Sequence, residues 1–271
     1  TTAEHDYSLS FDGVDDYVEI DDVYDVSSSF TFGAWVYDNG DGGVIMSKHF
    51  FNTDVNPPWG KYTGYMIGQW EGLLQFRMVN DLSGHGPGCP CGFDLIASSS
   101  NLLTNQWYHI VGVFESGQSI KLYVNGTEVS SNLTSETNLF DISQPFIIGA
   151  QNQYDQLNNH WNGKVDDAFV YQGALTADEI NNLYTGNQSP DSFSDELVGY
   201  WNINEGEGDN PNYNLIDNSG MGNNGTIHGA TWNTDVPAGC TDLYAENYDE
   251  NASVDDGSCS GYPDNGDYAL S

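Results

Sequence analysis

Apolar and polar residues alternate with a period of two in the segment WYHIVGVFESGQSIKLYVNG, which spans residues 107–126. The alternation over 107–114, and again over 120–124, places successive side chains on opposite faces, as in two β-strands joined by the polar turn 115–118. Asn125-Gly126 then supplies the residues with positive φ that a second tight turn needs. This segment therefore predicts antiparallel β structure.

Short apolar runs of the same kind recur along the first 175 residues, and Gly, Asn, Asp and Pro separate them. Such spacing is typical of an all-β antiparallel β-sandwich. The predicted strands lie within 7–20, 30–38, 43–50, 64–70, 73–80, 145–151 and 161–175.

One helix is predicted, from Thr176 to Leu183. Thr176 and Glu179 have the spacing of a capping box, and Gly186 follows where a helix commonly ends.

The chain has 271 residues, enough for one large sandwich with its own core and a small additional module. It carries 40 acidic residues against 5 basic ones, a net charge of −35. Such a surface repels nucleic acid and anionic membranes, so neither is an expected partner. Two explanations of the high negative charge remain, divalent cation binding and solvation in a salty environment. The sequence has no apolar run near the ~20 residues of a membrane span.

The order of several short motifs resembles the laminin-G-like, concanavalin-A-like jelly-roll family over about 180 residues. The motifs are FDGVDDYV at 11–18, AWV at 34–36, the hairpin at 107–126, GKVDDAFVY at 163–171 and ALTADEI at 174–180. The resemblance implies a jelly roll that serves either as a lectin-like binder or as a structural spacer.

Residues 197–232 resemble the opening strands of that family, although they follow the other motifs here. A sandwich without its first strand would expose an unpaired edge, so this segment is expected to fold back and give a circularly permuted sandwich over 1–236. The alternative is the truncated start of a second domain. Residues 237–271 would form a separate small module.

The two ends of the chain carry similar pentapeptides, DYSLS at 6–10 and DYALS at 267–271. Their spacing of 261 residues favours one unit of a tandem array or an end-to-end assembly. Neighbouring copies of the same unit are therefore expected partners.

Four cysteines allow three disulfide pairings, and pairing between near neighbours, Cys89 with Cys91 and Cys240 with Cys259, is expected. The Asp/Asn-rich segment from 239 to 259 resembles a cysteine-bounded module of secreted bacterial proteins. A bridge closing it contributes roughly 3 kcal/mol in the loop-entropy model. The competing interpretation is a zinc site with His85. Disulfides imply an extracellular or cell-surface location.

Calcium is the expected cofactor, because it binds carboxylate, amide and backbone oxygens. The family resemblance implies a structural ion held by Asp217, Asn223 and Asp166. A second candidate set lies in the cysteine loop: Asp242, Asp249 and Asp255. The alternative for both sets is that these side chains cap turns by accepting backbone N–H bonds.

Carbohydrate binding is suggested by aromatic residues in two loop regions. The first lies between 50 and 70 and includes Trp70, with Trp59 and Tyr62 as the candidates, and the second contains Tyr154 and Trp161. Such rings are more commonly core or loop anchors.

No catalytic motif occurs, neither the E-x-D-x-E strand of related glycanases nor a G-x-S-x-G or H-E-x-x-H string. The sequence thus predicts a non-catalytic, calcium-stabilised repeat unit of a surface adhesin or fibre. The alternative is a carbohydrate-binding module from a secreted polysaccharide-degrading enzyme.

Overall fold

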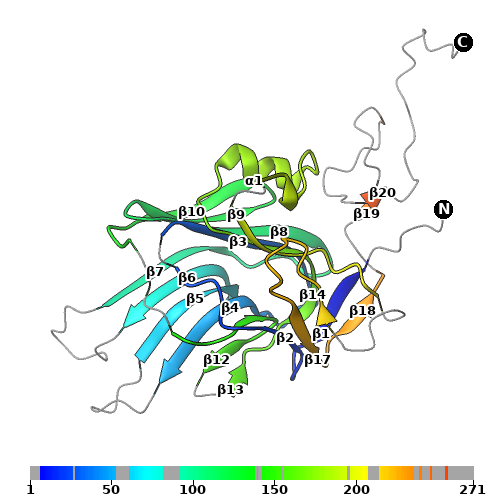
Figure 1. Cartoon of the computed structure of the whole chain (residues 1–271), viewed down its shortest axis with the longest axis horizontal. Coiled ribbons are helices and arrows are strands. Elements are labelled where there is room, and N and C mark those ends of the chain that lie inside the picture. Colours follow the sequence, from blue (N-terminus) through cyan, green and yellow to red (C-terminus); the bar gives the residue numbers. More distant parts are fainter. Residues whose placement is uncertain are drawn as a thin grey trace, which may run out of the picture.

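The computed structural model describes residues 7–26, 28–52, 61–81, 92–137, 139, 142–153, 156–193, 196–206, 214–234, 238–239, 245 and 254–255. Within these residues two antiparallel sheets face each other as a sandwich, and one short helix lies on the outer face of the first sheet (Figure 1). This is the all-β antiparallel sandwich of jelly-roll type that the sequence predicts.

Sheet A carries the helix, and its strands follow a spatial order unlike their order in the sequence. From one edge to the other they are β10 (Thr127–Leu133), β9 (Ser119–Val124), β8 (Trp107–Glu115), β3 (Phe30–Asp38), β14 (Asn162–Tyr171), β1 (Ser8–Asp12) and β18 (Thr231–Asn233), with β15 (Leu197–Trp201) also paired to β14.

Sheet B lies on the other side of the core. Its spatial order is β16 (Asn214–Leu215), β17 (Gly225–His228), β2 (Tyr17–Ile20), β11 (Phe146–Ile148), β4 (Gly43–Asn52), β5 (Lys61–Trp70), β6 (Leu73–Asp81) and β7 (Gly92–Ser100). Five further elements lie outside the two sheets: β12 (Gln151–Gln153) and β13 (Gln156–Asn158), which form a hairpin, the 3₁₀ turn η1 (Pro190–Phe193), and β19 (Ala238–Gly239) and β20 (Val254–Asp255), which form a parallel pair.

The predicted hairpin at 107–126 is confirmed by strands β8 and β9. Ile110 and Phe114 point into the core between the sheets, and Val111 and Val113 point to the opposite face, as alternation requires. Asn125 and Gly126 both have positive φ and turn the chain into β10.

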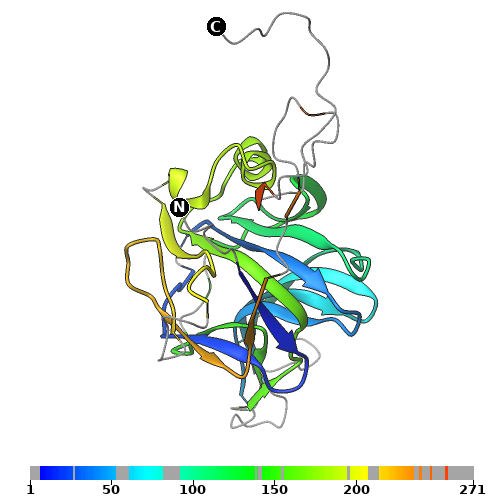
Figure 2. The same cartoon turned by 90° about the vertical axis from the view of Figure 1, so that its right-hand side faces the viewer.

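The C-terminal strands complete both sheets, as the sequence predicts for 197–232. β1 pairs with the first half of β14 and β15 with its second half, so two distant segments share one edge of the same strand. β18 then pairs with β1, and β17 pairs with β2 (Figures 1 and 2). These pairings cover edges of β14, β1 and β2 that would otherwise be left open.

The core between the sheets is largely aromatic. Trp201 of β15 is fully buried and stacks on Phe146, with 6.0 Å between ring centroids. Phe30, Phe32 and Phe76 form a second group of rings in mutual contact. Because β15 supplies Trp201, the C-terminal segment contributes core volume as well as backbone pairing.

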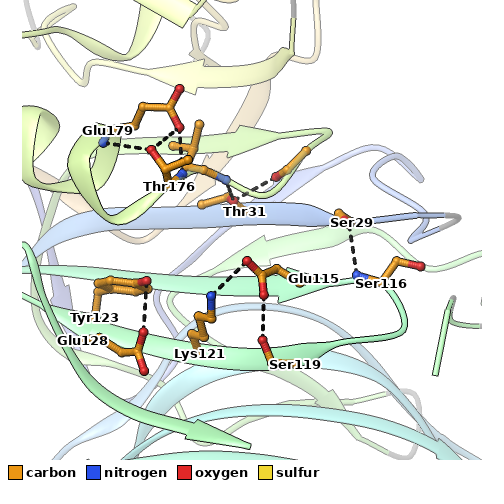
Figure 3. Close-up of polar contacts among 12 residues, drawn as sticks. Ser29, Thr31, Glu115, Ser116, Ser119, Lys121, Tyr123, Glu128, Thr176 and Glu179 are labelled. Carbon is orange, nitrogen blue, oxygen red and sulfur yellow. Dashed lines mark hydrogen bonds and ion pairs between the residues drawn. The ribbon is translucent and has the colours of Figure 1, made fainter. Parts of the chain in front are cut away.

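Helix α1 (Ala177–Tyr184) confirms the predicted helix, and Thr176 and Glu179 form its capping box (Figure 3). Thr31 Oγ1 on β3 donates to the Gly173 carbonyl and accepts from the Leu175 N–H, which fixes the segment leading into the helix. The apolar side of the helix then packs on the outer face of sheet A and forms a second, smaller core.

The four cysteines, the terminal pentapeptides 6–10 and 267–271, and the boundary of the predicted small module lie wholly or partly outside the described residues. The predicted disulfides, the alternative zinc site with His85 and the end-to-end assembly therefore stay predictions.

Candidate functional site

A groove of about 1170 Å³ lies on the outer face of sheet B. Strands β4 to β7 form its floor, and the β12–β13 hairpin borders it beside β4, joined there by the hydrogen bond from Val44 N–H to the Asn159 carbonyl (2.8 Å). We call this hollow the sheet B groove. Ligand sites in proteins are commonly concave surfaces of roughly 300–1,000 Å³, so it is large.

The floor of the sheet B groove follows directly from strand register. Met66 of β5 lies opposite Arg77 of β6, and Arg77 lies opposite Ile96 of β7. Gln75 precedes Arg77 by two residues and shares its face, and Trp70 shares the face of Met66 in the same way. The alternating residues, such as Leu74 and Phe76, point into the core instead. Pleating therefore builds a floor of mixed apolar and polar side chains.

The rim of the sheet B groove is formed by strand ends and turns at one end of the sandwich. Asp12 ends β1, Asp41 lies between β3 and β4, and Glu71 lies between β5 and β6; all three are exposed. Asn162 Nδ2 donates to Asp41 Oδ2 at 2.9 Å, and this bond ties the segment between β3 and β4 to the start of β14. Arg77 on the floor is the one Lys or Arg among the described residues that line the groove. The rim is thus acidic and the floor carries one cation.

Three aspartates gather beside this rim: Asp12 at the end of β1, and Asp15 and Asp16 in the turn that leads to β2. Carboxylate oxygens of Asp12, Asp15 and Asp16 lie within 4.8 Å of one another, the one such group of His, Cys, Asp or Glu found among the described residues. Asp16 accepts a hydrogen bond from the Asp12 N–H (2.9 Å), and Asp12 accepts one from the Val14 N–H (2.8 Å). Burial raises the pKa of Asp16, and the nearby Asp12 and Asp15 add to the rise. This group is not among the sites predicted from the sequence, and its signal there is the D-x-x-D-D spacing at 12–16.

The predicted calcium ligands Asp217 and Asn223 serve here to protect a strand edge. Asp217 accepts hydrogen bonds from the N–H groups of Tyr200 (3.1 Å), Ser219 (2.9 Å) and Asn223 (2.8 Å). Asn223 Nδ2 donates to the Val198 carbonyl at 3.0 Å. The 217–223 loop thus occupies the open edge of β15. This is the turn-capping role that the sequence left as an alternative for both residues.

Asp166, the third ligand of that set, is buried on β14, where its Oδ1 accepts the N–H of Asp167 at 2.8 Å. Of the second set, Asp242 and Asp249 lie outside the described residues, and Asp255 is described only by its backbone in β20. Calcium binding stays a prediction for both sets.

The aromatic candidates have a mixed outcome. The prediction that Trp161 offers its ring to a ligand is wrong: the side chain is fully buried, and Gly163 packs against its indole. Trp59 and Tyr154 lie outside the described residues, as does the side chain of Tyr62. Trp70, from the same aromatic-rich stretch, is half-buried at the sheet B groove.

A smaller cavity of about 160 Å³ lies beneath α1, on the outer face of sheet A. His109 lines it at 2% exposure, and its Nδ1 has no hydrogen-bond partner. Burial lowers the pKa of His109 to about 3, so the imidazole is neutral at physiological pH. Tyr200 donates to Asp167 Oδ1 (2.8 Å) at the same cavity.

Among the described residues, no helix has the length and apolar character needed to cross a bilayer.

Comparison with known proteins identifies the fold. No curated protein sequence matches the chain. A crystal structure of a candidate carbohydrate-binding protein from Bacteroides ovatus is 20% identical, with a TM-score of 0.59 over 85% of this chain and 60% of that one. The SAP-like pentraxin of Limulus polyphemus is 16% identical, with a TM-score of 0.48 over 68% and 83% of the two chains. This chain thus spans less than two thirds of the Bacteroides protein. The family model for the concanavalin A-like lectin/glucanase superfamily matches residues 12–181, more than half of the chain, which therefore belongs to this superfamily.

Proposed function

We propose that this chain is an extracellular, non-catalytic carbohydrate-binding domain whose ligand lies in the sheet B groove. The observation that carries the proposal is the combination of Trp70 with the polar floor residues Gln75 and Arg77 on one concave sheet face. An aromatic ring can stack on the apolar face of a sugar while amides and a guanidinium bind its hydroxyl groups. Membership of a superfamily that includes lectins supports this assignment.

Binding without catalysis agrees with the placement of the carboxylates. Glycoside hydrolases hold two carboxyl groups on either side of the scissile bond. Among the described floor side chains, none is acidic, and the carboxylates of Asp12, Asp41 and Glu71 belong to the rim at one end. We therefore assign the groove to recognition. The adhesin role predicted from the terminal pentapeptides depends on residues outside the described part of the chain. The sheet B groove lies within the described part, and we therefore propose carbohydrate binding as the function.

A glycan array followed by titration calorimetry tests the proposal. The whole chain should bind at least one oligosaccharide, and Trp70→Ala should weaken that affinity about tenfold or more, since truncating a tryptophan that contacts the ligand commonly removes much of a binding energy. Trp70→Phe keeps a ring and should retain part of the affinity.

Leu133→Ala is the matched control, because Leu133 is 89% exposed on β10 of the other sheet. It should bind as the unchanged chain does. The absence of any glycan ligand, or equal affinity for the Trp70→Ala variant, contradicts the proposed function.

A further inference from the structure

We infer that the sheet B groove selects neutral polysaccharide chains over anionic ones and binds several sugar units together. This inference rests on the proposed function and adds the class of ligand to it. Three observations carry it: the charges of the rim, the kind of polar groups in the groove, and the size of the groove.

The charge at the rim opposes anions. Asp12, Asp41 and Glu71 are exposed around one end, and Asp15 and Asp16 lie within 4.8 Å of Asp12. Against them the described lining offers one Lys or Arg, Arg77, within a chain of net charge −35. At a separation of about 4–6 Å in water, each neighbouring carboxylate weakens binding of a single anionic group about three- to fivefold. Uronate or sulfate groups bound near this end would meet several such carboxylates.

The polar groups in the groove suit hydroxyl ligands. Gln75, Gln151, Asn158 and Asn162 line it, and a side-chain amide both donates and accepts, as a sugar hydroxyl does. Gln151 Nε2 donates to Asn158 Oδ1 at 3.1 Å, which fixes the orientation of these two amides before a ligand arrives. A neutral chain satisfies such groups without bringing charge to the acidic rim.

The size of the groove favours an extended ligand. Its volume of about 1170 Å³ exceeds the ~300–1,000 Å³ of a usual small-molecule pocket. The floor also crosses four strands, β4 to β7, so one monosaccharide would contact only part of it. Affinity should therefore rise with the number of linked sugars.

Calorimetry with matched neutral and anionic oligosaccharides tests this inference. The panel holds neutral xylo-, manno- and gluco-oligosaccharides of one to six units, and oligogalacturonates and heparin fragments of the same lengths. We expect neutral chains to bind, with affinity rising about tenfold or more from one unit to four and changing less than about twofold between 0.02 and 0.5 M NaCl. Anionic chains should bind at least about tenfold more weakly at 0.02 M NaCl.

The double variant Asp41→Asn with Glu71→Gln should raise the ratio of anionic to neutral affinity about tenfold, since it removes two rim charges. Asp178→Asn, on α1 beyond sheet A, is the matched control and should leave that ratio unchanged. If only anionic chains bind tightly, and Arg77→Gln weakens their binding, the inference is overturned and the proposed function stays intact. Binding of no glycan overturns both.

Discussion

Replacing Asp217 tests whether this carboxylate acts as the cap of a strand edge or as a calcium ligand. In Asp217→Ala the N–H groups of Tyr200, Ser219 and Asn223 lose their shared acceptor. A hydrogen bond to a charged group is worth about 1.5–3 kcal/mol, but Ser219 and Asn223 are half-buried and their N–H groups can reach water in the variant. We therefore expect the free energy of unfolding to fall by about 3 kcal/mol.

Urea denaturation of the whole chain, followed by tryptophan fluorescence and circular dichroism, measures this loss, and an unchanged m-value shows that the unfolded state is comparable. Asp217→Asn keeps one carbonyl acceptor and should lose about half as much. Asp21→Ala, at an exposed position, should stay within about 0.5 kcal/mol of the unchanged chain. The loss should be equal in calcium and in excess EDTA. A loss that appears only with calcium would refute the capping role and favour the ion.

Three further measurements address the fold and its predicted cofactor. Trp201→Ala should lower the free energy of unfolding by about 4 kcal/mol, because it empties a fully buried site stacked on Phe146; a loss below about 1 kcal/mol would mean that β15 is dispensable. The pKa of His109 is lowered to about 3 in the folded state, so the unfolded state binds more protons than the folded state below about pH 6.5. As pH falls from 6.5 toward 3, His109 should therefore lower the free energy of unfolding by up to about 1.4 kcal/mol per pH unit. His109→Asn should remove that contribution, and parallel pH profiles of the two chains would contradict it. If calcium binds the folded chain, free ion at a hundredfold excess over Kd adds about 2.7 kcal/mol, so EDTA should lower the melting temperature measured by calorimetry; no change on chelation removes the calcium prediction.

Structural features that depend on residues close together in the chain could be predicted from the sequence. The alternation in β8 and β9 and the capping box at Thr176 each depend on residues a few positions apart, and the structure has both. The return of 197–232 to the sandwich was also predictable, because the remaining strands would have left an unpaired edge.

The site was less predictable because it depends on which strands lie side by side. The alternation in β6 separates Gln75 and Arg77 from Leu74 and Phe76, yet only the register with β5 and β7 places Arg77 between Met66 and Ile96. Similarly, Trp161 resembles an exposed loop residue in sequence, yet it is buried in the core between the sheets, where its backbone N–H donates to the Gly149 carbonyl at 2.8 Å.

The shared edge of β14 has a consequence for how the chain acquires its structure during synthesis. β1 and β15 occupy the two halves of that edge, and β18 then pairs with β1 across more than 200 residues of sequence. Contacts of such long range slow folding, because closing the long intervening loop costs conformational entropy before the contact stabilises the chain. On the ribosome, the second half of the β14 edge and the outer edge of β1 must therefore wait for residues 197–233 to emerge. During that interval the edge of β14 is open to wrong partners, and the acidic surface provides the repulsion that keeps nascent chains apart.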